Sequence, residues 1–196
     1  SLVQENRFLL EKDPDYVKRL DNLPEKERQA LKFGNWDIFD GQFFTEFNRN
    51  IHVCTPFEIP KDWRRYRTRD YGLDMCAVCW IAMDWKMNAY VYKEFYKSNL
   101  IVSSAAEEIN AMTNENIVID YAPPDLWNRN RDTGKSTADI FAENGQFLTE
   151  ADDNRKTGWL AVHEWLKVFS DEQVQPTSKL KIFSNCTNLI RTLPAL

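Results

Sequence analysis

The pattern of apolar and polar positions between residues 66 and 96 predicts three consecutive β-strands. Segments rich in β-branched and aromatic residues, bounded by turn residues, are typical of strands. We expect strands at 66–72, 75–84 and 87–96, the last two separated only by the polar hinge Asp84-Trp85-Lys86. Strands joined by so short a connection pair antiparallel. The pattern therefore predicts a three-stranded antiparallel meander.

Helical and extended segments alternate after this meander. Glu107 follows Ser104 by three residues, the spacing of a capping box at a helix start. Asn116–Tyr121 is an apolar run, typical of a strand buried on both faces. The expected elements are a helix opening at 103–109, a strand at 116–121, a helix at 137–143 that stops at Gly145, an extended segment at 146–149, an amphipathic helix at 156–169, a strand at 180–183 and a helix from Cys186.

The first 60 residues have a different pattern. A cap and an early proline predict a helix that starts at Asp21 and stops at Gly34. A stretch rich in Trp and Phe follows, and prolines at 56 and 60 end it. Dense aromatic residues of this kind usually pack on a neighbouring domain. We therefore divide the chain into a helical and irregular preamble, residues 1–60, and a main domain, residues 61–196.

Strand direction brings two aspartates to one edge of the predicted sheet. If the first strand of the meander runs up, the third also runs up, the helix returns, and the strand at 116–121 runs parallel to the first. Asp70 and Asp120 end these two strands. Ligands bind at the carboxyl ends of parallel strands in open sheets, so we expect chemistry at this edge.

Composition limits the classes of function. A formal net charge of −5 argues against a generally basic, sequence-reading nucleic-acid domain, and the chain has neither a membrane-span-like apolar run nor the order of a signal peptide. Cytosolic placement is therefore expected. Cys76 and Cys79 form a C-x-x-C pair, but residues three apart on a strand face opposite sides. We favour buried reduced thiols over a zinc or redox site.

The order of elements, with an acid on the first and fourth strands, resembles the ribonuclease H-like fold: an α/β mixed sheet of a three-stranded antiparallel meander plus parallel strands, flanked by helices. Local motifs extend the resemblance to the nuclease domain of bacteriophage large terminase subunits over almost the whole chain. These motifs are Leu23-Pro24-Glu25, Gly34-Asn35-Trp36-Asp37, Gly41-Gln42-Phe43-Phe44, Trp63, Asp70-Tyr71-Gly72, Asp120-Tyr121-Ala122-Pro123-Pro124, Asp132-Thr133-Gly134, Arg155-Lys156-Thr157-Gly158-Trp159 and Asn188-Leu189-Ile190-Arg191-Thr192-Leu193.

The resemblance implies a metal-dependent endodeoxyribonuclease that cuts concatemeric double-stranded viral DNA in the host cytoplasm. Its implied partners are an ATPase domain, a small terminase subunit and a portal. Gly134-Lys135-Ser136 lacks the first glycine of a phosphate-binding loop, so we interpret it as a helix start and expect no ATPase here. The family's third carboxylate lies in a late helix, which we expect beyond Leu196.

Two Mg²⁺ or Mn²⁺ ions can activate water and stabilise the charge of phosphodiester hydrolysis, and such hard ions prefer carboxylate ligands. By the resemblance we assign Asp70 as the bridging ligand and Asp120 as a ligand to one ion. Asp74 is the candidate for a further ligand or water-positioning group. Their structural alternatives are a turn-forming acid at Asp70 and a cap at Asp120.

Basic residues concentrate near the proposed edge, where DNA phosphates would be their partners. Solvated surface is the alternative for each of them. On a strand, Arg65, Arg67 and Arg69 alternate away from Asp70, which weakens the case for those three. The candidates for DNA binding are Arg129, Arg131, Lys135, Arg155 and Lys156.

Two other functions stay open. One is a catalytically incomplete docking module of the packaging motor, because the third acid is missing from the sequence. The other is a different ribonuclease H-like nuclease, such as a resolvase or an RNA:DNA hybrid nuclease, against which the aromatic preamble argues.

Overall fold

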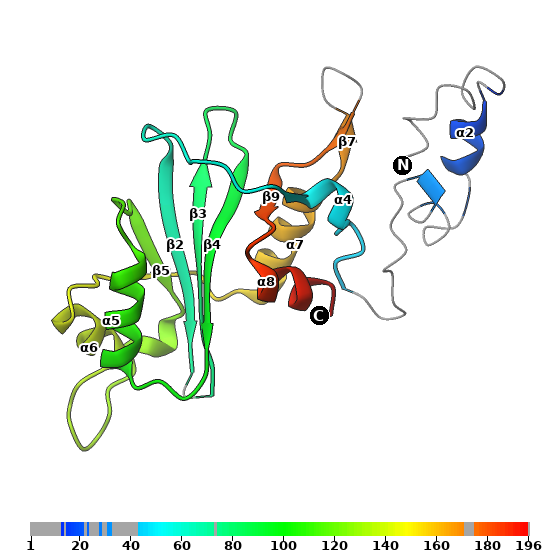
Figure 1. The fold of residues 1–196 in the computed structure, drawn as a ribbon. Helices are drawn as coiled ribbons and strands as arrows, with labels where there is room; N and C mark the ends of the chain where they lie inside the picture. The colour runs from blue at the N-terminus through cyan, green and yellow to red at the C-terminus, as the bar shows by residue number, and fades with distance from the viewer. Residues whose placement is uncertain are drawn as a thin grey trace.

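The structure is a computed structural model that describes residues 13, 15–21, 23, 28, 31–32, 43–72, 74–170 and 175–195. Its centre is a mixed sheet with helices on both faces (Figure 1). None of the helices in these described ranges is long and apolar enough to cross a membrane. The predicted helix at 21–34 and the motifs at 24–25, 34–37 and 41–42 fall wholly or mainly outside the described residues, as does Leu196.

Seven strands of the described chain form the main sheet, in the order β1-β9-β4-β3-β2-β5-β6. The meander β2-β3-β4 lies at its centre, and both of its pairings are antiparallel, as predicted. The strands are β1 (Val53–Cys54), β2 (Arg64–Tyr71), β3 (Cys76–Met83), β4 (Ala89–Lys97), β5 (Ile119–Ala122), β6 (Thr149–Glu150) and β9 (Leu180–Phe183), while β7 (Phe169–Ser170) and β8 (Pro176–Thr177) pair separately.

Helices cover the two faces of the sheet with separate apolar clusters. Trp80 and Phe95 of the sheet pack with α5 and α6 in one cluster, whereas Val91 and Ile182 pack with α7 and α8 in the other. We call the two sides the α5/α6 face and the α7/α8 face (Figure 1). The helices are α2 (Tyr16–Asp21), α4 (Arg49–His52), α5 (Val102–Met112), α6 (Thr137–Glu143), α7 (Arg155–Leu166) and α8 (Thr187–Thr192), with 3-10 turns η2 (Pro124–Trp127) and η3 (Leu193–Ala195).

The start of α6 confirms the interpretation of Gly134-Lys135-Ser136 as a helix start. Ser136 accepts a hydrogen bond from the backbone of Asp139, and the Asp139 carboxylate accepts one from the Ser136 N–H. This reciprocal pairing satisfies two N–H groups at the helix end. Gly145 follows the helix with φ +81°, a left-handed conformation that favours glycine.

Three predicted boundaries are wrong. Helix α5 begins at Val102, and its N-cap, Ile101, makes no side-chain cap, so the serines and Glu107 lie inside the helix instead of capping it. Strand β5 begins at Ile119, after an exposed Val118, because pairing with β2 and β6 sets its limits. Helix α7 ends at Leu166, and Phe169 belongs to strand β7 instead.

The cysteine pair lies as predicted. Cys76 packs in the α5/α6 cluster, and Cys79 packs against the α7/α8 cluster. Burial raises the pKa of Cys76 to about 11 and that of Cys79 to about 12, which keeps both as thiols. Because the two thiols face opposite sides of β3, they cannot bind one ion together.

The described part of the aromatic stretch packs on α7 and the sheet. Phe44 and Phe47 are buried in the α7/α8 cluster. His52 is fully buried on α4, where Nδ1 accepts from the Asn48 N–H and Nε2 donates to the carbonyl of Leu166 at the end of α7. These contacts join residues 43–52 to α7 and the sheet.

Candidate functional site

Strands β2 and β5 run parallel, as the sequence predicts, and the structure places them side by side. Their carboxyl ends therefore lie at the same edge of the sheet. Asp70 is the penultimate residue of β2 and is exposed. Asp120, in contrast, is the second residue of β5 and is 6% exposed. The two acids differ in depth and environment.

The strand register places Asp70 and Asp120 on opposite faces of the sheet. Asp120 pairs with Arg67, so its side chain shares the face of Arg67 and Arg69. Asp70 is three residues beyond Arg67 and points to the other face. A rise of about 3.3 Å per residue and a strand spacing of about 4.8 Å put the two Cα atoms roughly 11 Å apart. The structure does not bring the predicted pair together.

Asp120 is the acceptor at the centre of a buried ion-pair cluster on the α5/α6 face. Arg67 Nε donates to its Oδ2 at 2.9 Å, and Arg69 Nε donates to its Oδ1 at 3.3 Å. The Nη2 atoms of both arginines also pair with Oδ2. The Arg67 and Arg69 side chains are 6% and 0% exposed. Both oxygens of the carboxylate are therefore engaged by guanidinium groups.

Gln146 extends this cluster toward helix α5. Arg69 Nη1 donates to Gln146 Oε1 at 2.7 Å, and Gln146 Nε2 donates to the carbonyl of Ala106 and to Asn110 Oδ1. Burial lowers the pKa of Arg69 to about 10, partly opposed by the Asp120 charge. Its guanidinium also lies 4.5 Å from the ring centroid of Phe141. These contacts fix Arg69 and Asp120 in the interior.

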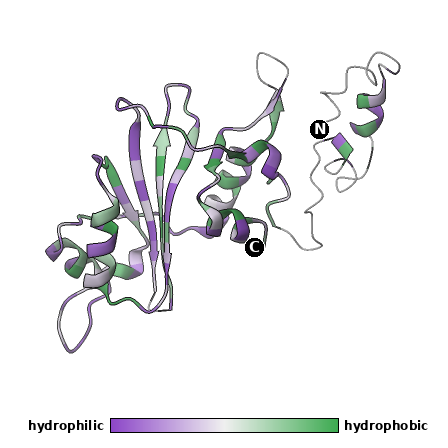
Figure 2. Ribbon diagram, viewed as in Figure 1, coloured by the Kyte–Doolittle hydropathy of each residue, from purple (hydrophilic) through white to green (hydrophobic). Residues whose placement is uncertain are grey.

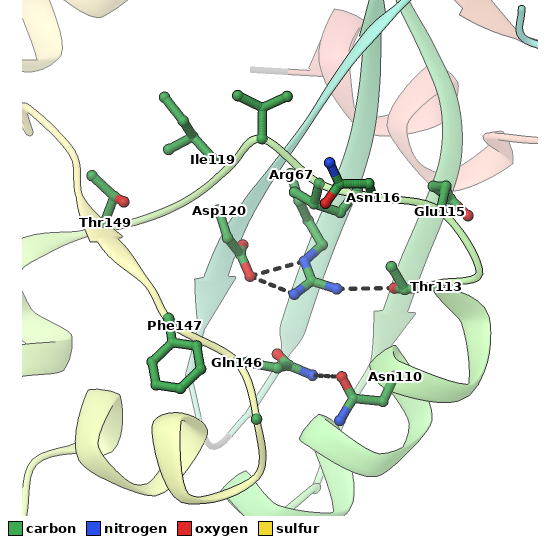
Figure 3. Close-up of a pocket in the computed structure, with 13 residues that line it drawn as sticks. Arg67, Asn110, Thr113, Glu115, Asn116, Ile119, Asp120, Gln146, Phe147 and Thr149 are labelled. Carbon is green, nitrogen blue, oxygen red and sulfur yellow. Dashed lines mark hydrogen bonds and ion pairs between the residues drawn. The ribbon is translucent and has the colours of Figure 1, made fainter. Parts of the chain in front are cut away.

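A polar pocket of about 640 Å³ lies over this cluster (Figure 3). Arg67 and Asp120 line it, and Arg67 Nη1 donates to Thr113 Oγ1 at 2.9 Å. At one side lies Phe147, whose side chain is 79% exposed. Asp120 supplies one negative charge to two arginines, so the cluster of Arg67, Arg69 and Asp120 keeps one formal positive charge beside the pocket.

The surroundings of Asp70 are open. Asp70 and Thr68, its neighbour on the same face of β2, are both exposed, although α7 and α8 cover other parts of this face. Asp74 is exposed in the turn that follows, where Gly72 N–H donates to the carbonyl of Met75. Asp70 thus lies on an accessible part of the α7/α8 face, at the carboxyl end of its strand.

The five predicted DNA-binding residues are exposed. Arg129 donates to the carbonyl of Gly134 across loop 128–136, and Lys135 pairs with Glu143. Arg155 and Lys156 open α7. Loop 128–136 projects from the end of the sheet that carries the β2–β3 turn (Figure 1), and it is mainly hydrophilic (Figure 2). The role of these five residues in DNA binding stays a prediction.

Sequence reasoning missed the Asp120 cluster, although part of its signal was present. The alternation of Arg67 and Arg69 away from Asp70 correctly gives the face of the arginines. An acid within an apolar strand also needs a buried counter-charge. Only the pairing register between β2 and β5 connects these two facts. Nothing in the sequence near Gln146 indicates that it joins the cluster, because it comes from a segment expected to be extended.

No protein-family model matches the sequence, and no curated protein matches it. Solved structures do match. The large terminase nuclease domain of bacteriophage P22 aligns with a TM-score of 0.62 and 16% identity, over 80% of this chain and 79% of that one. The large terminase nuclease of thermophilic phage G20c, with bound magnesium, aligns with a TM-score of 0.53 and 11% identity, over 78% of this chain and 79% of that one.

A large terminase from another thermophilic bacteriophage, solved in complex with ADP, aligns with a TM-score of 0.64 and 14% identity. That alignment covers 99% of this chain, which spans only 46% of the other protein. The chain therefore has the ribonuclease H-like fold of large terminase nuclease domains, the fold that its sequence predicts.

Proposed function

We propose that this chain is the nuclease domain of a viral DNA-packaging terminase and cleaves double-stranded DNA at the edge of the sheet that carries Asp70. The fold shared with the P22 and G20c nuclease domains carries this proposal. Asp70 supports it, because an exposed carboxylate at the carboxyl end of a central strand lies where open α/β sheets bind their ligands.

The fold also suggests a divalent metal ion, since the G20c nuclease was solved with magnesium. The described residues fit this ion only in part. They contain no group of three acidic, histidine or cysteine side chains that could hold a metal ion. Asp120 is occupied by two arginines, so two-metal hydrolysis by Asp70 and Asp120 does not fit the structure. Asp70 is the ligand this chain would supply, with Asp74 as a further candidate.

DNA would approach the same edge through the exposed basic residues of loop 128–136 and the start of α7. Arg131 is the best probe, because Arg129 and Lys135 both have contacts within the protein. An arginine that contacts a phosphate contributes about one unit to the slope of log affinity against log salt. Arg131→Ala should reduce the slope by about this amount and weaken binding to all DNA sequences alike.

Nicking of supercoiled plasmid DNA by the purified chain in Mn²⁺ tests the proposed activity. The wild type should convert supercoiled to open-circular DNA, and Asp70→Asn should not. Asp153→Asn, which removes an exposed acid on the connection before α7, is the matched control and should keep wild-type activity. Equal nicking by wild type and Asp70→Asn would refute the site.

A docking module of the packaging motor is the second candidate. The engagement of Asp120 by Arg67 and Arg69 favours it, because it leaves the edge short of carboxylates. Wild-type chain that binds DNA in a salt-dependent way but shows no Mn²⁺-dependent nicking would support this candidate over the nuclease.

A further inference from the structure

The residue that directly follows β5, in line with Asp70 on β2, is a proline. The paired residues of β2 and β5 are Tyr66 with Ile119, Arg67 with Asp120 and Thr68 with Tyr121. Two further steps in this register pair Asp70 with Pro123. Pro123 keeps an extended backbone, with φ −67° and ψ 151°, so the alternation of β5 continues through it.

Burial along β5 agrees with this alternation. Asp120 and Ala122 are buried on the α5/α6 side, Ala122 within the apolar cluster. Tyr121 and Pro123 alternate with these two residues and therefore lie on the opposite face. Both are half-buried. Neighbouring strands lie about 4.8 Å apart, so side chains at paired positions on one face start about this distance apart. A carboxylate at position 123 would therefore lie within reach of a metal ion held by Asp70.

We infer that the divalent-metal site on the Asp70 face lacks its β5 carboxylate in this chain, because Pro123 stands at the position where that ligand would lie, and that Asp120 is a structural ion-pair residue. This inference refines the site of the proposed nuclease. It rests on the proposed nuclease function only for the expectation that the ligand is a divalent metal ion. The register between β2 and β5 does not depend on the function.

Asp120 cannot take the place of this ligand by a small movement. Turning it to the Asp70 face requires a one-residue slip of β5, which would reverse the face of every side chain on the strand. The slip would expose Ala122 and leave Arg67 and Arg69 buried without their counter-charge. The three charged residues together hold the strand in its register.

Pro123→Asp supplies the missing carboxylate with little disturbance. Aspartate adopts this extended backbone, and it is favourable before Pro124 and at the N-cap of η2. Two controls match it. Pro124→Asp adds the same charge one residue later, and Pro123→Asn has the same shape without the charge. Positions 123 and 124 are both half-buried.

Calorimetric titration with Mn²⁺ of the whole chain tests the inference, with near-ultraviolet circular dichroism to establish that each variant is folded. An added carboxylate ligand strengthens binding of hard cations strongly. We expect Pro123→Asp to bind Mn²⁺ at least about tenfold more tightly than wild type, and Pro124→Asp and Pro123→Asn to stay within about twofold of wild type. Adding Asp70→Asn to Pro123→Asp should remove the gain.

Two results would overturn the inference. One is Mn²⁺ affinity that rises equally, or does not rise, in folded Pro123→Asp and Pro124→Asp. The other is wild-type Mn²⁺ binding that disappears in a folded Asp120→Asn variant, since Asp120 would then be the ligand. The proposed function fails separately: if Pro123→Asp binds Mn²⁺ tightly while neither it nor the wild type nicks DNA, the inference stands and the nuclease is refuted.

Discussion

Replacing Asp120 by asparagine leaves two buried guanidinium groups without a counter-charge. The Arg67 and Arg69 side chains are 6% and 0% exposed, so water cannot screen them. Breaking a buried pair by removing one partner costs about 3–5 kcal/mol, because a charge stays buried and uncompensated. The asparagine also presents an NH₂ donor toward guanidinium donors. The free energy of unfolding should therefore fall by about this amount.

The measurement is urea unfolding followed by tryptophan fluorescence, with the midpoint and slope fitted separately. For a chain of this length the loss corresponds to a melting temperature lower by roughly 6–20 °C. Asp70→Asn is the matched control, because Asp70 is exposed, and surface substitutions usually change stability by less than about 0.5 kcal/mol.

A double-mutant cycle separates the ion pair from a general packing defect. Arg69→Gln in the Asp120→Asn background removes one of the stranded charges, so the combined loss should be smaller than the sum of the single losses. Stability of Asp120→Asn within about 1 kcal/mol of wild type would refute the reasoning. It would also reopen a role for Asp120 as an exposed ligand.

Two further predictions concern residues that hold the fold. Burial lowers the pKa of His52 below its ordinary value, so the unfolded chain binds the proton more readily. Stability should therefore fall as pH drops from about 6.5 through the lower pKa of the folded state, and unfolding measurements against pH should show this component missing in His52→Gln. Gly145→Ala should cost about 1–2 kcal/mol of unfolding free energy because of its positive φ, although its Cβ would meet no atom within 4 Å. Gly158→Ala, inside α7 and equally open, should instead stabilise the chain by about 0.5–1 kcal/mol. Equal effects of the two alanines in denaturant unfolding would contradict the backbone argument.

Local sequence patterns were sufficient to predict most of the helices and strands in residues 61–196. The meander, the parallel direction of β5 against β2, and the start of α6 at Ser136 all follow from spacing, turn residues and caps. These features depend on residues near one another in sequence. The boundaries of β5 and α7 were wrong, because contacts with other strands and helices end those elements.

The chemistry at the sheet edge was predicted less well, for a physical reason. The sequence by itself determined that Asp70 and Asp120 lie on parallel strands and that Arg67 and Arg69 face away from Asp70. Only the tertiary structure decided the register between β2 and β5, because a one-residue shift costs nothing locally but reverses every side chain. In that register Asp120 pairs with Arg67 and Arg69, and Pro123 lies beside Asp70.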